Sequence, residues 1–171
     1  MKTQLLFLII IFLFFISSSF SQNSTSISSI DSITALLKTD KEDTNKVRHL
    51  NDLGWKLMYI NPDTSILLNK QALELATIIE QRTLISKSPA IQMSAKKGIA
   101  RSNSYLGACY FLKGEYAIAL EYHFKSLKLN EELGSKYGIS GNLNNIGLIY
   151  YGQGDYSRAL DYYFKALKLN E

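Results

Sequence analysis

The sequence predicts an all-α protein built as a solenoid of antiparallel helical hairpins, and three observations support this. Residues 101–131 and 141–171 match at a fixed offset of 40, with fourteen of the thirty-one positions identical. Apolar residues within each copy recur at steps of three and four, which is the period of an amphipathic helix. A short glycine-containing segment divides each copy into two such stripes. Each copy is therefore a hairpin, and hairpins stack because each needs a neighbour to cover its apolar face.

The composition fits one ordinary domain and excludes several classes of protein. The 171 residues are 46% hydrophobic and 20% charged, which is too apolar and too evenly charged for a disordered chain. Cys109 is the only cysteine, so neither a disulfide framework nor a cysteine zinc site is available. His49 and His123 lie far apart in the sequence with no acidic cluster between them. We therefore expect no metal and no cofactor.

The first 21 residues are predicted to be a signal peptide. Lys2 is followed by twelve unbroken apolar residues at 5–16, and small residues stand at Ser19 and Ser21. Twelve residues are too few to cross a hydrocarbon core, which needs about 20 apolar residues in a helix. We expect cleavage near Ser21 and export to the periplasm or the extracellular space. An uncleaved N-terminal membrane anchor is the alternative.

The rest of the chain divides into a short leader and a repeat domain. Residues 22–42 are predicted to be a Ser-rich tether with a short helix near 30–38. Helical hairpins are expected at about 43–82, 89–133 and 136–171, the first being a weaker copy of the other two. Without residues 1–21 the chain has 18 basic and 15 acidic residues. This small excess does not indicate a nucleic-acid partner.

The turns of the hairpins follow from residues with special backbone preferences. Gly114 and Gly154 permit the chain to reverse between the two helices of a copy. Upstream, Asn61 is expected to cap a helix that has Pro62 at its first position.

One pattern recurs along the chain, in the last two copies most fully and in the first copy in part: Leu-Gly-x-x-Tyr, then Gly-x-Tyr-x-x-Ala-Leu, then Ala-Leu-x-Leu. It resembles the tetratricopeptide repeat, a resemblance that implies a right-handed solenoid with a concave face lined by the first helix of each hairpin. A glycine within a helix costs about 1 kcal/mol relative to alanine, so its recurrence predicts that the two helices approach closely there. The structural repeat positions are Gly54, Gly107, Tyr110, Ala119, Gly147, Tyr150, Ala159 and Ala166.

The sequence departs from the family pattern at three points, one of which is that Glu131 and Glu171 stand where the common form of the repeat has proline. Ser126 replaces the second small alanine in the middle copy. The period is 40 residues, whereas the common form of the repeat has 34, so this chain resembles the longer repeats of kinesin light chain and of bacterial regulators.

No motif supports catalysis, and we expect the protein not to be an enzyme. Gly152-x-Gly154 lacks the third glycine of a dinucleotide-binding loop and the strand that should precede it. His123 falls on a helical stripe and is expected to be packed. Cys109 is expected to be a small buried apolar residue.

Binding of a protein or peptide is the predicted function. By the resemblance, the residues that face the groove are Asn51, Trp55, Tyr59, Ser104, Ala108, Phe111, Asn144, Leu148 and Tyr151. An asparagine amide both donates and accepts hydrogen bonds, which suits an extended peptide ligand. Arg48 and Arg101 align and could supply charge at the rim. The alternative interpretation is that these polar residues only solvate the first helices.

A second functional hypothesis comes from a further resemblance. Residues 44–53 resemble the extracytoplasmic N-terminal region of sensor proteins from Bacteroidetes-type bacteria. This implies a sensory domain of a membrane-bound histidine kinase or transcriptional regulator. Because stacked repeats need a polar helix over the last apolar face, we expect the repeats to continue beyond residue 171. This second hypothesis includes a membrane tether in the downstream sequence.

Overall fold

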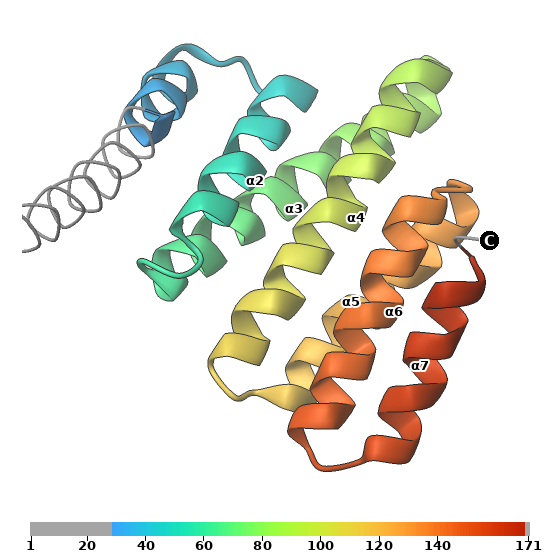
Figure 1. Cartoon of the computed structure of the whole chain (residues 1–171). Coiled ribbons are helices and arrows are strands. Elements are labelled where there is room, and N and C mark those ends of the chain that lie inside the picture. Colours follow the sequence, from blue (N-terminus) through green and yellow to red (C-terminus); the bar gives the residue numbers. More distant parts are fainter. Residues whose placement is uncertain (1–28, 170–171) are drawn as a thin grey trace, which may run out of the picture.

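The computed structural model describes residues 29–169, a part of the chain that is largely helical and contains no strand (Figure 1). The predicted signal peptide at 1–21 lies outside the described residues. Residues 29–39 are helical and precede the six labelled helices. These are α2 (Thr44–Leu57), α3 (Pro62–Ser86), α4 (Pro89–Leu112), α5 (Tyr116–Glu132), α6 (Lys136–Gly152) and α7 (Tyr156–Lys168).

Successive helices form antiparallel hairpins that stack side by side. α2 pairs with α3, α4 with α5, and α6 with α7, while α4 also packs on α3 and α6 on α5. The first helices α2, α4 and α6 line one face of the stack, and α3 and α5 lie behind them (Figure 1). This arrangement confirms the predicted all-α solenoid of hairpins.

Local sequence fixes where the helices begin. Asp43 accepts hydrogen bonds from the backbone N–H groups of Asn45 and Lys46 at the start of α2. Asn61 accepts one from Thr64 at the start of α3, with Pro62 in the first turn. Such caps satisfy N–H groups that have no partner within the helix.

Two tight turns of the hairpins use glycine in a conformation that other residues rarely adopt. Gly114 between α4 and α5 has φ 75°, and Gly154 between α6 and α7 has φ 78°. A side chain at this φ is strained, so glycine is the residue that allows the reversal.

Glycine also brings the two helices of each hairpin together. A Cβ added to Gly54 would lie 2.5 Å from an atom of the facing side chain, and one added to Gly107 or Gly147 would lie 2.7 Å from such an atom. The facing residues are Asn69 for Gly54, His123 for Gly107 and Tyr163 for Gly147. In each hairpin, a side chain of the second helix therefore packs directly on the backbone of the first helix at this glycine position.

Apolar clusters join the hairpins into one body. The first cluster spans three helices and consists of Val47, Leu50, Ala72, Leu75, Ala76, Ile79, Ala95 and Ile99. The last cluster contains Ile146, Tyr150 and Ala159, with Leu120 and Leu127 of α5 packed against it. Ala119 and Ala166 are also buried.

Stacked tyrosine pairs repeat from hairpin to hairpin. The ring centroids of Tyr110 and Tyr122 lie 5.5 Å apart, and those of Tyr150 and Tyr162 lie the same distance apart.

Among the described residues, no helix has both the length and the apolar character needed to cross a membrane.

Candidate binding groove

A hollow of about 660 Å³ opens between α4 and α6, at the end where α5 turns into α6. Trp55 of α2 borders it on one side. The remaining lining comes from α4, the end of α5 and the first half of α6. These residues are Lys97, Ala100, Arg101, Ser104, Tyr105, Ala108, Ser126, Asn130, Leu133, Ser135, Tyr137, Gly138, Gly141, Asn142 and Asn145.

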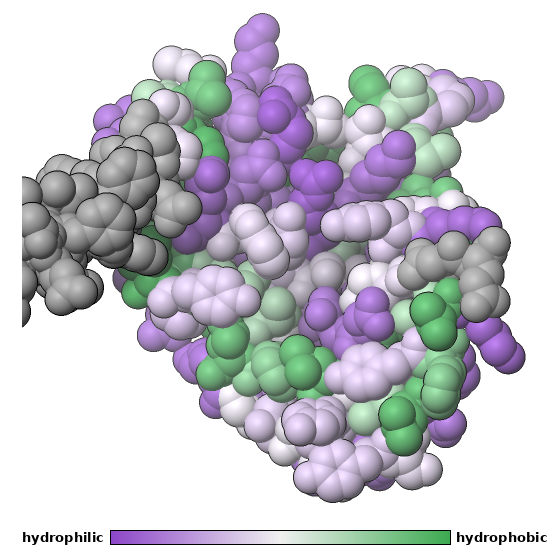
Figure 2. Space-filling view, viewed as in Figure 1, coloured by the Kyte–Doolittle hydropathy of each residue, from purple (hydrophilic) through white to green (hydrophobic). Residues whose placement is uncertain are grey.

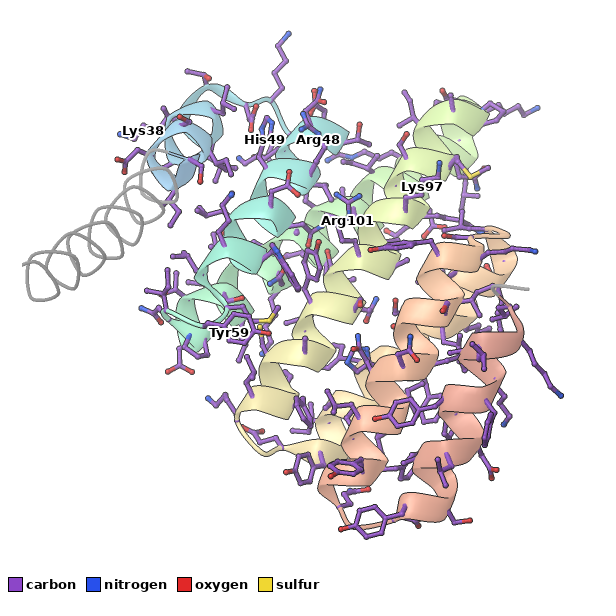
Figure 3. The ribbon with its side chains drawn as sticks, in the orientation of Figure 1. Lys38, Arg48, His49, Tyr59, Lys97 and Arg101 are labelled. Carbon is purple, nitrogen blue, oxygen red and sulfur yellow. The ribbon has the colours of Figure 1, made fainter. Side chains whose placement is uncertain are left out.

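The charge in the hollow is entirely positive. Lys97 and Arg101 are its two charged lining residues, and no Asp or Glu is among them. They stand one turn apart on α4, and Arg48 projects from the neighbouring helix α2 (Figure 3). Arg101 has one carboxylate nearby, Asp52, whose Oδ1 lies 3.6 Å from Arg101 Nη1.

Aromatic rings border the same hollow. Trp55 packs on Tyr105 with ring centroids 5.0 Å apart and an interplanar angle of 31°. Burial raises the pKa of the Tyr105 hydroxyl, Arg101 lowers it and Asp52 raises it, with a net increase. The hydroxyl therefore stays protonated at neutral pH and keeps its proton for donation. Tyr137, which is 93% exposed, lies on the opposite side.

A network of hydrogen bonds fixes the floor of the hollow. Ser126 Oγ donates to the Ala100 carbonyl oxygen at 2.8 Å and accepts from Asn142 Nδ2 at 2.9 Å. Asn130 Nδ2 donates to the Ser126 carbonyl oxygen at 2.9 Å. Because these polar groups are already bonded to each other, the floor is held in one arrangement before any ligand arrives.

His123 lies below this floor and supports it. Its Nδ1 and Asn142 Oδ1 are 3.2 Å apart, and burial lowers the pKa of the imidazole to about 4. A neutral ring with its proton on Nδ1 donates to the amide oxygen, which can only accept. Cys109 is also fully buried, and burial raises the pKa of its thiol. Both residues are packed inside the stack.

Three of the predicted groove residues, Trp55, Ser104 and Ala108, line the hollow. Asn51 does not line it, because its side chain is 0% exposed, so the prediction that Asn51 faces the groove is wrong. Asn51 Oδ1 accepts a hydrogen bond from Ser102 Oγ at 2.9 Å. Because α2 packs directly on α4 at this level, the amide joins the two helices and does not face a ligand.

The remaining predicted groove residues lie elsewhere on the surface: Tyr59, Phe111, Asn144, Leu148 and Tyr151. Tyr59 follows the end of α2 and is 75% exposed (Figure 3). Phe111 and Tyr151 contact the tyrosines that open α5 and α7. Asn144 is exposed on α6, outside the lining of the hollow.

Sequence reasoning missed several lining residues, although some had a recognisable signal. Lys97 lies four residues before Arg101, a spacing that places both on one face of a helix. Tyr105 and Asn145 are each the next residue after a predicted groove position, Ser104 and Asn144. No feature of the sequence indicated that Tyr137 would line the hollow, because it lies before the repeated segment 141–171.

Part of this stack matches a known family by sequence. Residues 98–171, which include most of α4 and all of α5, α6 and α7, match the family model described as tetratricopeptide repeat. This part of the chain is therefore similar in sequence to tetratricopeptide repeats. Repeats of this type are typically non-enzymatic scaffolds that contact other proteins.

Solved structures share the fold. The apo form of RapI has a TM-score of 0.65 and 19% identity, over 86% of this chain and 38% of RapI. Aspartyl phosphate phosphatase F from Bacillus subtilis has a TM-score of 0.66 and 16% identity, over 85% of this chain and 38% of the phosphatase. Identities this low show the tetratricopeptide-type fold alone, and the chain spans about two fifths of each protein. No curated protein matches the chain by sequence.

Proposed function

We propose that this chain is a protein-interaction module that binds a peptide or a segment of a partner protein in the hollow between α4 and α6. The observation that carries the proposal is the hollow itself, an opening of about 660 Å³ on the face of the first helices. Ligand sites are concave and combine aromatic walls with a few placed polar groups. Here Trp55 and Tyr105 provide the wall, and Asn142 and Asn145 lie on the opposite helix.

The polar lining suits the backbone of an extended chain. Ser104 and Asn145 face the opening from α4 and α6, and neither side chain is fully buried. An amide and a hydroxyl can each donate and accept, so both match the alternating N–H and C=O groups of a peptide. The fixed floor around Ser126 means that little ordering is needed when a ligand binds.

Trp55 makes the proposal directly measurable. It is the only tryptophan of the chain and it borders the hollow with 49% of its surface exposed. We expect degenerate pools of ten-residue peptides to change its fluorescence in a saturable way. The peptides themselves should contain no tryptophan, so that the signal reports Trp55 alone.

Gly141 provides a blocking variant with a matched control. It lines the hollow, and a Cβ added there would meet no atom within 4 Å. Gly141→Phe should fill the opening and abolish the fluorescence change, whereas Gly141→Ala should bind as the natural chain does. Absence of binding by any pool, or binding that survives Gly141→Phe, would overturn the proposed site.

We also propose that the protein is exported, with residues 1–21 as signal peptide, 22–42 as tether and leading helix, and 43–171 as repeat domain. The run of apolar residues at 5–16 behind Lys2 supports this division. Mass spectrometry of the chain recovered after expression in a bacterium should show a new N-terminus after Ser21. A chain that keeps Met1 and stays with the membrane fraction would favour an N-terminal anchor.

A second candidate function is the sensory domain of a membrane-bound signalling protein. The apolar face of α7 favours it: Leu160 and Leu167 are 54% and 56% exposed. Their repeat mates on α5, Leu120 and Leu127, pack against the apolar cluster of α6 and α7. Figure 2 shows hydrophobic residues gathered over α7. A further repeat packed on this face would cover it, as α6 covers α5.

The reading frame of the gene separates the two candidates. Continuation past codon 171 into more repeats, a membrane span and a kinase or DNA-binding region would establish the sensory role. A stop codon directly after Glu171 would contradict it and leave the interaction module as the function.

A further inference from the structure

We infer that the ligand of the hollow is an acidic extended segment that carries two carboxylates at alternate positions. This inference rests on the proposed function, because it names the chemistry of the segment that the hollow would bind. Three observations carry it: the sign of the charge in the hollow, the lack of internal neutralisation of that charge, and the spacing of the two cations.

The two cations of the hollow are poorly neutralised by the protein. Among the described residues Lys97 has no ion-pair partner, whereas Lys96, its neighbour in sequence, contacts Glu132 at 3.3 Å and Glu80 at 4.0 Å. Arg101 pairs with Asp52 at 3.6 Å, with side chains 47% and 36% exposed. An ion pair so open to water contributes little, so Arg101 remains available to a ligand.

The surrounding surface reinforces the positive potential. Arg48 stands on α2 beside the two cations of α4, and its guanidinium contacts the His49 ring at 3.0 Å but no carboxylate among the described residues (Figure 3). Figure 2 shows strongly hydrophilic side chains concentrated over this end of the face, with less polar residues towards the other end. Clustered charges of one sign attract an oppositely charged segment and speed its association.

The spacing of Lys97 and Arg101 specifies how the carboxylates are arranged. Four residues of helix span about 6 Å along the axis. In an extended chain, residues i and i+2 point to the same side and lie about 6.5 Å apart. An extended segment with the pattern acidic-x-acidic therefore places one carboxylate at each cation. Its intervening side chain points away, and the flanking residues reach Trp55 and Tyr137.

The decisive probes are four pools of ten-residue peptides, degenerate at all other positions and measured through Trp55 fluorescence. One pool has Glu fixed at positions 5 and 7, one has Gln there and one has Lys there. The fourth has Glu at positions 5 and 6. We expect the Glu 5,7 pool to bind about tenfold more tightly than the Gln pool. The Glu 5,6 pool should bind with intermediate strength, and the Lys pool should bind most weakly.

Charge reversal in the protein provides a second test. The double variant Lys97→Glu/Arg101→Glu should lose about tenfold or more in affinity for the Glu 5,7 pool and prefer the Lys pool. The matched control is Lys128→Glu/Lys165→Glu, which makes the same change of net charge on α5 and α7, outside the lining. This control should keep the preference for the Glu 5,7 pool.

Removal of the competing carboxylate should act in the opposite direction. Asp52→Asn frees Arg101 and removes a like charge from the edge of the hollow, so affinity for the Glu 5,7 pool should rise a few-fold. Added salt should weaken binding of the Glu 5,7 pool more than binding of the Gln pool.

The outcomes separate this inference from the function on which it rests. If the Gln pool binds as tightly as the Glu 5,7 pool and Gly141→Phe blocks both, the hollow is a peptide site and the acidic preference is wrong. If no pool binds, the proposed function fails as well. Equal affinity for the Glu 5,7 and Glu 5,6 pools would overturn the alternate spacing of the carboxylates.

Discussion

The joint between the first and second hairpins is closed, whereas the joint between the second and third is open. At the first joint α2 packs directly on α4, where a Cβ on Gly98 would lie 2.7 Å from Val47 Cγ1. At the second joint the hollow separates α4 from α6, and a Cβ on Gly141 would meet nothing within 4 Å. The two joints have the same topology, so the difference lies in the side chains.

Polar substitutions at equivalent positions account for this difference. Ala72 and Ala76 of α3 belong to the apolar cluster that closes the first joint. Their repeat mates on α5 are Ser126 and Asn130, which bond to each other and line the hollow. Ser126 and Asn130 form hydrogen bonds with each other, so they gain little from closer packing of the first helices. The methyl groups of Ala72 and Ala76 are buried only when the neighbouring helices pack closely. The open joint therefore contains the hollow that we propose as the binding site.

The largest expected effect is a dependence of stability on pH that comes from His123, which contacts Asn142 at the second joint. The pKa of His123 is lowered to about 4 by burial, below the ordinary value of 6.5. The unfolded chain therefore binds the proton first as the pH falls. About 3 kcal/mol of stability should be lost between pH 6.5 and pH 4 and retained above pH 6.5.

Urea unfolding across this pH range tests the effect. The control is His123→Asn, which copies Asn69 at the same position of the first hairpin and does not titrate. The loss in the natural chain relative to this variant isolates the histidine from carboxylates that also titrate. Equal pH dependence in both chains would show that His123 does not report on the open joint.

A smaller effect should distinguish the two joints by their free space. Gly98→Val forces a branched side chain against Val47, which is 2% exposed and cannot move away, so about 2 kcal/mol should be lost. Gly141→Val on the open joint should change stability by less than about 0.5 kcal/mol. Thermal unfolding of both variants measures the contrast, and equal losses would contradict it.

The smallest expected effect concerns the hydrogen bond that ties α2 to α4. Ser102→Ala removes the donor to the fully buried Asn51 oxygen, which should cost about 1 to 2 kcal/mol. Ser104→Ala, two residues away in the lining of the open hollow, should leave stability nearly unchanged. A similar loss of unfolding free energy in both variants would mean that the Ser102–Asn51 hydrogen bond does not stabilise the protein.

The sequence was sufficient to predict the fold because the repeat is expressed in local residues. Glycine in the turns and apolar residues at steps of three and four each specify local structure, and the match at an offset of 40 shows that this local structure repeats. The hollow was harder to predict, because it depends on how far apart two neighbouring hairpins settle. Asn51 illustrates this: its repeat position predicts a groove, yet the closed joint buries it.

The most direct test of the central claim is backbone amide hydrogen exchange with and without a saturating Glu 5,7 peptide. We expect protection to increase at 97–108 of α4 and at 137–145 of α6, the segments that line the hollow. Exchange in α3 and α7 should not change. Protection confined to α7, or spread evenly over all the hairpins, would contradict the assignment of the open joint as the binding site.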